Sequence, residues 1–313
     1  MRLIQQTTSI DFLGTKRRKI ALVLSALFVI ASFVSLATRG LEFGIDFTGG
    51  VLLEVAYPQA ADLETIRSNL ADAGFSDAQV QRFGDDTDVL VRLPPQGDAE
   101  ASEIRARLQG TLEAGGETVV LRRVEFVSPQ VGEELTEQGG LAMIFAMLMI
   151  FAYVMFRFQW KFAVGAVTAL AHDVIVTVGF FSMLQLPFDL TVVAAVLAVI
   201  GYSLNDTVVA FDRIRENFFK LRGASAAESM NTSINEMLAR TLITGITTLL
   251  VLVALLVLGG ESIAPFSIAL IVGIIVGTYS SIYTASAMAL LLGVNAQDLL
   301  EPVKDPELID DLP

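Results

Sequence analysis

Apolar positions divide the chain into six long hydrophobic blocks, with an amphipathic stretch between the first and the second. Each block has about the length that a helix needs to cross the hydrocarbon core of a bilayer. The predicted spans are 20–38, 139–156, 162–184, 190–211, 241–258 and 263–292. The last is longer than a bilayer requires, so we expect it to tilt or to break near Gly293. The pattern predicts an α-helical membrane protein with six transmembrane helices.

Composition agrees with this class and excludes others. The 313 residues are 53% hydrophobic, with a mean hydropathy of +0.62. The net charge of −13 gives no electrostatic support for binding nucleic acid. The chain has no cysteine and a single histidine, His172, which excludes a multi-histidine metal centre. We expect no metal, no cofactor and no enzymatic activity.

Basic residues indicate the orientation in the membrane. Lys and Arg gather in segments 1–19, 157–161 and 212–240. The alternate short loops, 185–189 and 259–262, contain neither. Because cytoplasmic loops are enriched in Lys and Arg, both termini are predicted to be cytoplasmic. The cytoplasmic segments are then the N-terminal 1–19, the loop 212–240 and the tail 293–313, and residues 39–138 form an extracytoplasmic domain.

The first span has one alternative interpretation, a cleaved signal peptide. Basic residues precede it, and Ser35–Ala37 resembles a cleavage site. The apolar stretch is longer than the hydrophobic region of most signal peptides. Its length therefore favours a permanent span.

Residues 39–138 have the pattern of a small α+β domain. Strands are predicted at 51–57, 78–83, 89–93 and 118–127, and helices at 62–73 and 99–112. An acidic turn, Gly84–Asp86, separates the second and third strands. The order βαββαβ is that of a ferredoxin-like fold. The domain carries 8 arginines against 19 acidic residues, and its acidic surface is either a solvated face or a binding surface for an exported chain.

Asp206 is the leading functional candidate because ionisable groups inside spans are costly and mark functional sites by default. It lies in the segment Gly201–Thr207, roughly 24 Å from the outer end of the fourth span at 1.5 Å per residue. Arg240 opens the fifth span at a similar depth. An ion pair between them would keep Asp206 ionised, and its separation would let Asp206 take a proton. The alternatives are a static buried pair, or an Arg240 that snorkels to the headgroups.

Asp173 is the second candidate carboxylate, near the middle of the third span. It is either a member of a proton relay or an anchor for hydrogen bonds between helices. His172 precedes it, but adjacent residues on a helix do not share a face, so the two need not act together. The charged segment Asp212–Glu216 is interpreted as the interfacial exit of the fourth span.

Five motifs lie in or beside the spans. Three of them are Gly44–Gly50 (GIDFTGG) after the first span, Ala171–Asp173 (AHD) in the third and Gly201–Thr207 (GYSLNDT) in the fourth. Asp212–Asn217 (DRIREN) follows the fourth span, and Arg240–Thr244 (RTLIT) opens the fifth. Together these motifs resemble the SecD/SecF family of bacterial protein-export membrane proteins, within the resistance-nodulation-division (RND) superfamily.

The resemblance implies the six-span half of an RND-type bundle, paired with a SecD protein. It also implies association with the SecYEG channel and with YajC-type and YidC-type accessory proteins. The complex would use the proton-motive force to promote preprotein translocation across the inner membrane. Within the family pattern, Asp206 and Arg240 are linked to proton passage and the periplasmic domain moves. Gly44, Gly49 and Gly50 form a hinge or a plain connector, and Asp46 is assigned no role.

Two other functions stay open at this point. A half-size RND exporter of small hydrophobic compounds would share the spans and the acidic residue, although such exporters usually carry two large outer domains. A scaffold subunit that stabilises the channel complex would use Asp206 only for structure. The coupling ion, H⁺ or Na⁺, is not determined by the sequence.

Overall fold

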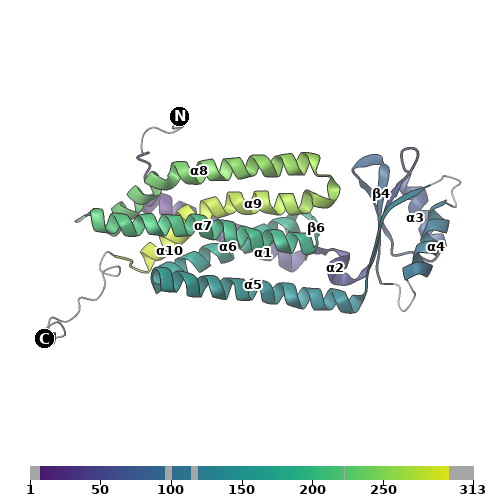
Figure 1. Cartoon of the computed structure of the whole chain (residues 1–313), viewed down its shortest axis with the longest axis horizontal. Helices are drawn as coiled ribbons and strands as arrows, with labels where there is room; N and C mark the ends of the chain where they lie inside the picture. The colour runs from purple at the N-terminus through teal and green to yellow at the C-terminus, as the bar shows by residue number, and fades with distance from the viewer. Residues whose placement is uncertain (1–7, 96–100, 114–118, 222, 296–313) are drawn as a thin grey trace, which may run out of the picture.

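The computed structural model describes residues 8–95, 101–113, 119–221 and 223–295. A bundle of long helices joins a small α/β unit at one end (Figure 1). We call residues Gly50–Val127 the outer domain, and the helix ends nearest to it the outer ends.

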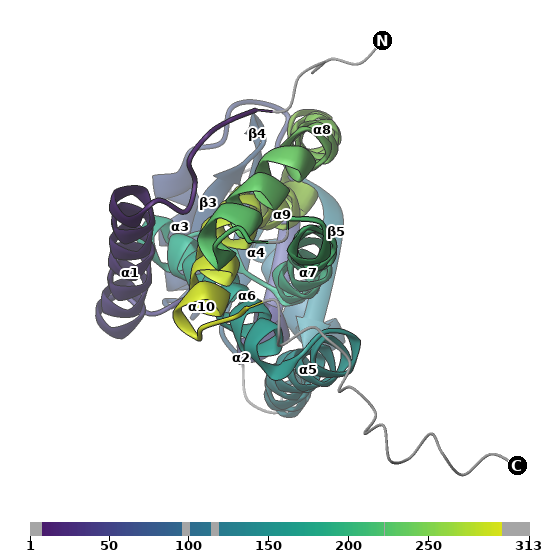
Figure 2. The ribbon, with the colours of Figure 1, turned by 90° about the vertical axis from the view of Figure 1, so that its left-hand side faces the viewer.

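Within the described residues, six helices are long and apolar enough to cross a membrane, in agreement with the six predicted spans. They are α1 (Thr15–Thr38), α5 (Pro129–Arg157), α6 (Trp160–Leu184), α7 (Leu190–Lys220), α8 (Ala226–Leu258) and the composite helix Glu261–Leu291. α6 is largely buried, whereas α5 and α8 expose most of their apolar side chains. Figure 2, which looks along the bundle, shows α1, α5 and α8 at its edges. The protein is therefore a membrane protein whose α6 is enclosed by its neighbours.

The helices extend well past the spans that hydropathy predicts. Segment 212–240, predicted as a loop, is largely helical, because α7 continues to Lys220 and α8 begins at Ala226. Ser225 and Glu228 form a capping box that starts α8. The spans were predicted from the length of each apolar stretch. That criterion does not detect the amphipathic turns by which a helix continues beyond the membrane.

The sixth span is not one regular helix. After a short 3₁₀ turn, η1 (Glu261–Ile263), it consists of α9 (Ala264–Ser280), a π-helical turn, η2 (Ser281–Ala285), and α10 (Ser286–Leu291). The helix ends at Leu291, two residues before Gly293, whose φ is 72°, and the π turn interrupts it earlier, which the sequence did not predict. Single π turns inside α-helices occur frequently at functional sites.

The outer domain has the predicted ferredoxin-like order. Its elements are β2 (Gly50–Ala56), α3 (Leu63–Asp72), β3 (Gln79–Phe83), β4 (Asp85–Leu93), α4 (Ala101–Glu113) and β5 (Val120–Val127). The antiparallel sheet has the order β3-β4-β2-β5, so β2 is a central strand. Alternate residues of β2, Leu53 and Val55, pack with Leu70 and Leu108 of the two helices.

Some predicted boundaries in this domain are wrong. β4 starts at Asp85, so the predicted acidic turn contracts to Gly84, whose positive φ of 77° suits glycine. Residues 99, 100 and 118, at the predicted starts of the second helix and the last strand, lie outside the described residues.

Three short elements join the outer domain to the bundle, and none was predicted. They are β1 (Glu42–Phe43), α2 (Ile45–Thr48) and β6 (Pro187–Phe188). β1 pairs in parallel with β6, the short strand just before α7. The chain between α1 and β2 is thus docked on the outer end of α7.

Candidate functional site

Asp206 lies on α7, where its side chain is buried, with a relative exposure of 5%. Among the described residues, its Oδ2 atom has no hydrogen-bond partner. Buried polar groups are nearly always hydrogen-bonded in folded proteins, so this oxygen requires an explanation.

Arg240 lies on α8, which packs against α7 (Figure 1). Its side chain is exposed, and it lies within range of an electrostatic interaction with Asp206. Among the described residues, however, no hydrogen bond or ion pair joins the two side chains. The predicted contact pair is therefore not formed in this structure, although the two charges act on each other across the α7–α8 interface.

Asp173 has the opposite environment. It lies on α6 with no exposed surface. Its Oδ2 atom accepts hydrogen bonds from Ser203 Oγ at 2.6 Å and Ser280 Oγ at 2.8 Å. His172 Nδ1 lies 3.1 Å from Oδ1, so the two neighbouring side chains are in contact. The carboxylate links α6, α7 and α9.

Further hydroxyl groups join α7 to the π turn near this carboxylate. Ser281, the first residue of the π turn, donates to the backbone oxygen of Ser203 at 3.3 Å. Its Oγ lies 2.9 Å from the Thr207 hydroxyl. Because the link from Ser281 to Ser203 ends on a backbone carbonyl, these hydroxyls hold helices together and form no continuous relay to Asp206 among the described residues. The sequence offered no spacing that singled out Ser203, Ser280 or Ser281.

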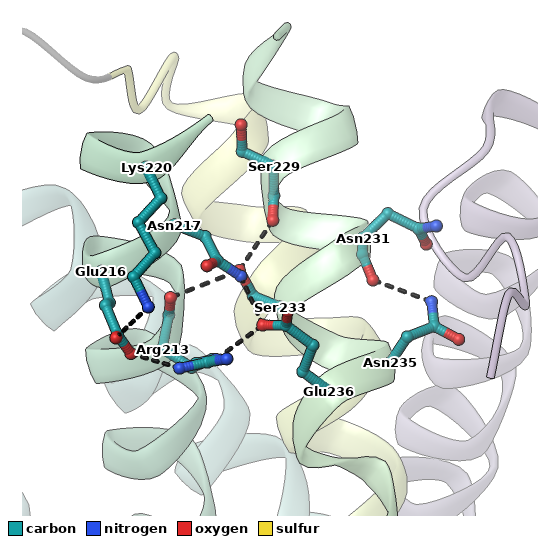
Figure 3. Close-up of polar contacts among 9 residues, drawn as sticks. All are labelled: Arg213, Glu216, Asn217, Lys220, Ser229, Asn231, Ser233, Asn235 and Glu236. Carbon is teal, nitrogen blue, oxygen red and sulfur yellow. Dashed lines mark hydrogen bonds and ion pairs between the residues drawn. The ribbon is translucent and has the colours of Figure 1, made fainter. Parts of the chain in front are cut away.

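A second polar cluster joins α7 and α8 at the end of the bundle far from the outer domain (Figure 3). Arg213 donates to Glu236 at 2.6 Å and also pairs with Glu216. Asn217 donates to Ser233 at 3.0 Å and to Glu236 at 2.7 Å. The predicted interfacial segment 212–216 is thus partly an interhelical contact surface. Its signal in the sequence is a polar face that continues the helical period beyond the span.

Two asparagines of α8, Asn231 and Asn235 (Figure 3), bind the N-terminal segment through its backbone. Asn235 Oδ1 accepts the backbone N–H of Ile10 at 2.8 Å, and Asn231 Oδ1 accepts that of Phe12 at 2.7 Å. Both amides also donate to the oxygen of Ile10. The chain before α1 is therefore fixed to the helix that carries Arg240.

The predicted hinge glycines lie at points of close backbone approach. Gly49 and Gly50 have positive φ values of 71° and 123°. A Cβ atom on Gly50 would lie 2.2 Å from the oxygen of Leu93, and one on Gly49 would lie 2.8 Å from Pro129 N. Gly44 has a φ of −69°, which any residue adopts, but a Cβ there would lie 3.1 Å from Asp189 Cβ. Their surroundings require small residues for packing.

Asp46, which the sequence did not single out, lies between these glycines and touches α7. Its Oδ2 atom accepts the backbone N–H of Leu190, the first residue of α7, at 2.9 Å. Among the described residues, no group of three or more His, Cys, Asp or Glu side chains could hold a metal ion. The candidate site therefore consists of carboxylates, hydroxyls and one arginine within the helix bundle.

Comparison with known proteins identifies the family. A family model described as "Protein export membrane protein SecD/SecF, C-terminal" matches residues 108–295, and one described as "SecD/SecF GG Motif" matches residues 34–61. The chain is 51% identical to "Protein translocase subunit SecF" of Vibrio alginolyticus over 92% of each chain. It is 48% identical to the protein of the same name from Pseudomonas aeruginosa, over 97% of this chain and 98% of that one.

A solved structure is also similar. The crystal structure of SecDF, "a translocon-associated membrane protein" from Thermus thermophilus, matches with a TM-score of 0.82 and 37% identity. The match covers 93% of this chain but 39% of the SecDF chain, so this protein spans well under half the length of that relative. On the family models and the curated relatives together, the chain belongs to the SecD/SecF family of protein-export membrane proteins.

Proposed function

We propose that this protein is a SecF-type subunit of the Sec protein translocase, which works with a SecD-type half to drive preprotein translocation with the proton-motive force. One observation carries the mechanism: Asp206 is buried inside a membrane helix with an oxygen that no group in the described residues satisfies. A carboxyl group in this state can exchange a proton without first breaking a hydrogen bond at that oxygen. The curated relatives are named as translocase subunits, which supports the same function.

Asp206 is the proton carrier in this proposal, and Arg240 is the charge that responds to it. When Asp206 is ionised, attraction across the α7–α8 interface favours one arrangement of the two helices. When it is protonated, that attraction is lost. Asp173, the third candidate, is held by hydroxyls from two other helices. Its surroundings favour the interhelical anchor over the relay member.

The available energy matches the task. One proton that crosses a potential of about 100 mV releases roughly 2.3 kcal/mol. A two-state arrangement of helices or of the outer domain that differs by a few kcal/mol is biased by this amount. No bond in the transported chain has to break.

The partners and the placement belong to the same proposal. The SecDF relative is a single chain much longer than this protein, which supports a separate SecD-type half as partner. The exposed apolar faces of α5 and α8 offer surface for that half or for lipid. SecYEG and the YajC-type and YidC-type accessory proteins are further proposed partners. The location of Lys and Arg supports the inner membrane, cytoplasmic termini and a periplasmic outer domain.

The test is export of a secreted reporter in cells that carry Asp206→Asn, with membrane levels followed by immunoblot. We expect normal levels and export as slow as in a strain that lacks the protein, because asparagine cannot carry the proton. Asp189→Asn is the matched control: it makes the same charge change on the same helix and keeps an acceptor for the helix start. Normal export by Asp206→Asn would contradict the mechanism and favour a scaffold subunit.

A further inference from the structure

The segment between α1 and the outer domain is bound to the bundle by backbone contacts. Ser182 Oγ, at the end of α6, donates to the oxygen of Gly40 at 2.7 Å. The N–H of Gly44 donates to the oxygen of Phe188 at 2.9 Å, beside the β1–β6 pair. These contacts attach the segment to the end of α6 and to the short strand before α7, but neither reaches α7, the helix that carries Asp206.

Asp46 makes the contact that reaches α7, the helix that carries Asp206. The first turn of a helix has N–H groups without intrahelical partners, and carboxylates are favoured there. In α7, Asp189 satisfies the N–H of Val192 at 3.0 Å, as an ordinary cap from the adjoining residue. Asp46 satisfies the N–H of Leu190 at 2.9 Å from a distant part of the chain. Two aspartates thus do similar chemistry on one helix end, and only one of them connects α7 to the outer domain.

Asp46 is firmly tied to the outer domain. It lies in α2, which leads through Gly49 into the central strand β2. α2 also presses on the start of α5, where a Cβ on Gly132 would lie 2.7 Å from the oxygen of Phe47. There is no room for a side chain between these backbones. A movement of Asp46 is therefore transmitted to β2 and the start of α5 rather than absorbed by a loose linker.

A second, weaker contact places the outer domain beside the turn that follows α8, the helix that carries Arg240. Arg123 of β5 donates to Ser262 Oγ, in η1, at 3.1 Å. Both side chains are exposed, so this contact can break at little cost. α2 thus holds the outer end of α7, which carries Asp206, and the outer domain touches the turn between α8 and α9.

We propose that Asp46 is the positioning residue that couples α7 to the outer domain, through its carboxylate on the N–H of Leu190. The inference rests on the proposed function. When the interaction between Asp206 and Arg240 changes, α7 shifts relative to α8. Asp46 carries that shift to β2, and the Arg123–Ser262 contact opens or closes in response.

The first test compares export by Asp46→Ala, Asp46→Asn and Asp189→Ala, each in the full chain with its translocase partners. Loss of one helix-end hydrogen bond from a charged acceptor is expected to slow export by about fivefold to tenfold in Asp46→Ala. Asp46→Asn keeps an acceptor oxygen and is expected to recover most of the rate. Asp189→Ala removes the ordinary cap of the same helix and is expected to export like the unaltered protein. Equal losses in the two alanine variants, or no loss in Asp46→Ala, would overturn the inference.

A second measurement reports the domain itself. The chain has no cysteine, so Arg123→Cys with Ser262→Cys gives a single thiol pair for a short bifunctional maleimide. We expect the cross-linking yield to change when a protonophore removes the proton-motive force, and this change to disappear when Asp46→Ala is added. A change that persists with Asp46→Ala, or a yield that never responds, would contradict the coupling role.

The two proposals fail separately. Asp206→Asn is measured in the same export assay. If Asp206→Asn exports normally, the proposed function itself is wrong. If Asp206→Asn stops export while Asp46→Ala exports normally, the proposed function stands and the coupling role of Asp46 is rejected.

Discussion

Asp173 and Asp206 are both carboxylates buried in the helix bundle, but their surroundings differ. Asp173 accepts two hydroxyl hydrogen bonds and contacts His172, whereas one oxygen of Asp206 has no partner among the described residues. A carboxylate with saturated hydrogen bonds stabilises the arrangement of helices around it. One with an unsatisfied oxygen costs stability and is retained for another reason. Burial alone therefore does not distinguish a structural aspartate from a functional one.

Helix geometry explains how the two environments arise. Asp173 lies where α6, α7 and α9 meet, and Gly277 leaves the space for its carboxylate beside Ser203. Asp206 belongs to the α7–α8 side of the bundle, and α8 exposes most of its length. In the first region both oxygens of the carboxylate have polar neighbours. In the second, the buried Oδ2 atom of Asp206 has no partner among the described residues.

The strongest test of this contrast is the stability of Asp173→Ala and Asp206→Ala. Asp173→Ala removes the acceptor of two buried hydroxyls and is expected to lower the free energy of unfolding by about 2–4 kcal/mol. Asp206→Ala removes no hydrogen bond at Oδ2, so we expect a change below about 1 kcal/mol. The measurement is thermal unfolding in detergent, followed by size-exclusion chromatography of the remaining monodisperse protein.

Single serine variants provide the control for that comparison. Ser203→Ala and Ser280→Ala each remove one hydrogen bond to Asp173 and are expected to cost about 1 kcal/mol each, since interhelical hydrogen bonds in membranes are modest. If Asp206→Ala proves as destabilising as Asp173→Ala, Asp206 has a structural partner, and the difference between the two sites disappears.

A pair of glycines tests the same contrast through packing. A Cβ on Gly277 would lie 3.0 Å from Ser203 Cβ, beside Asp173, whereas one on Gly201 would meet nothing within 4 Å. We expect Gly277→Ala to destabilise the bundle by about 1–3 kcal/mol through overpacking. Gly201→Ala is expected to leave stability unchanged or to raise it by up to about 1 kcal/mol. Equal behaviour of the two variants would show that the Asp173 region is not tightly packed.

Much of this architecture follows from patterns that the sequence displays directly. Six apolar blocks predict six helices because only helices of that length satisfy their backbone in lipid. Alternation in segments such as 51–57 predicts strands, and the order of elements predicts the ferredoxin-like sheet. Asp206 stands out because an acidic side chain inside a membrane span is costly and is therefore usually kept for function.

The remaining features depend on contacts between distant segments. β1 pairs with β6 and Asp46 meets Leu190 only after the bundle has assembled, so no local spacing predicts either contact. Ser203 and Ser280 are ordinary small residues of transmembrane helices until folding brings them to Asp173. The absence of a bond between Asp206 and Arg240 likewise depends on how α7 and α8 pack. The depth of each residue in the membrane, which is all that the sequence gives, does not determine that packing.

Asp62, in the outer domain, provides an exposed carboxylate for comparison and the smallest expected effect. Thr65 Oγ1 donates to it at 2.7 Å and the N–H of Glu64 at 3.1 Å, and these hydrogen bonds lower the pKa of Asp62 below its usual range. Because the folded pKa lies below the unfolded one, its stabilising contribution is complete above the unfolded pKa of about 3.9. This stabilising contribution is lost as the pH falls through the pKa of Asp62 in the folded protein.

We therefore expect Asp62→Ala to lower the unfolding temperature slightly at pH 7 and by less at about pH 2. Asp62→Asn keeps a capping oxygen without the titration, so its difference from the unaltered protein should be small and should vary less with pH. Thermal unfolding of the full chain in detergent at both pH values gives the comparison. A deficit for Asp62→Ala that is equal at both pH values would show that the carboxylate is not held by these two hydrogen bonds. Asp62 could then not serve as the exposed reference for Asp173 and Asp206, because its stability effect would not come from these hydrogen bonds.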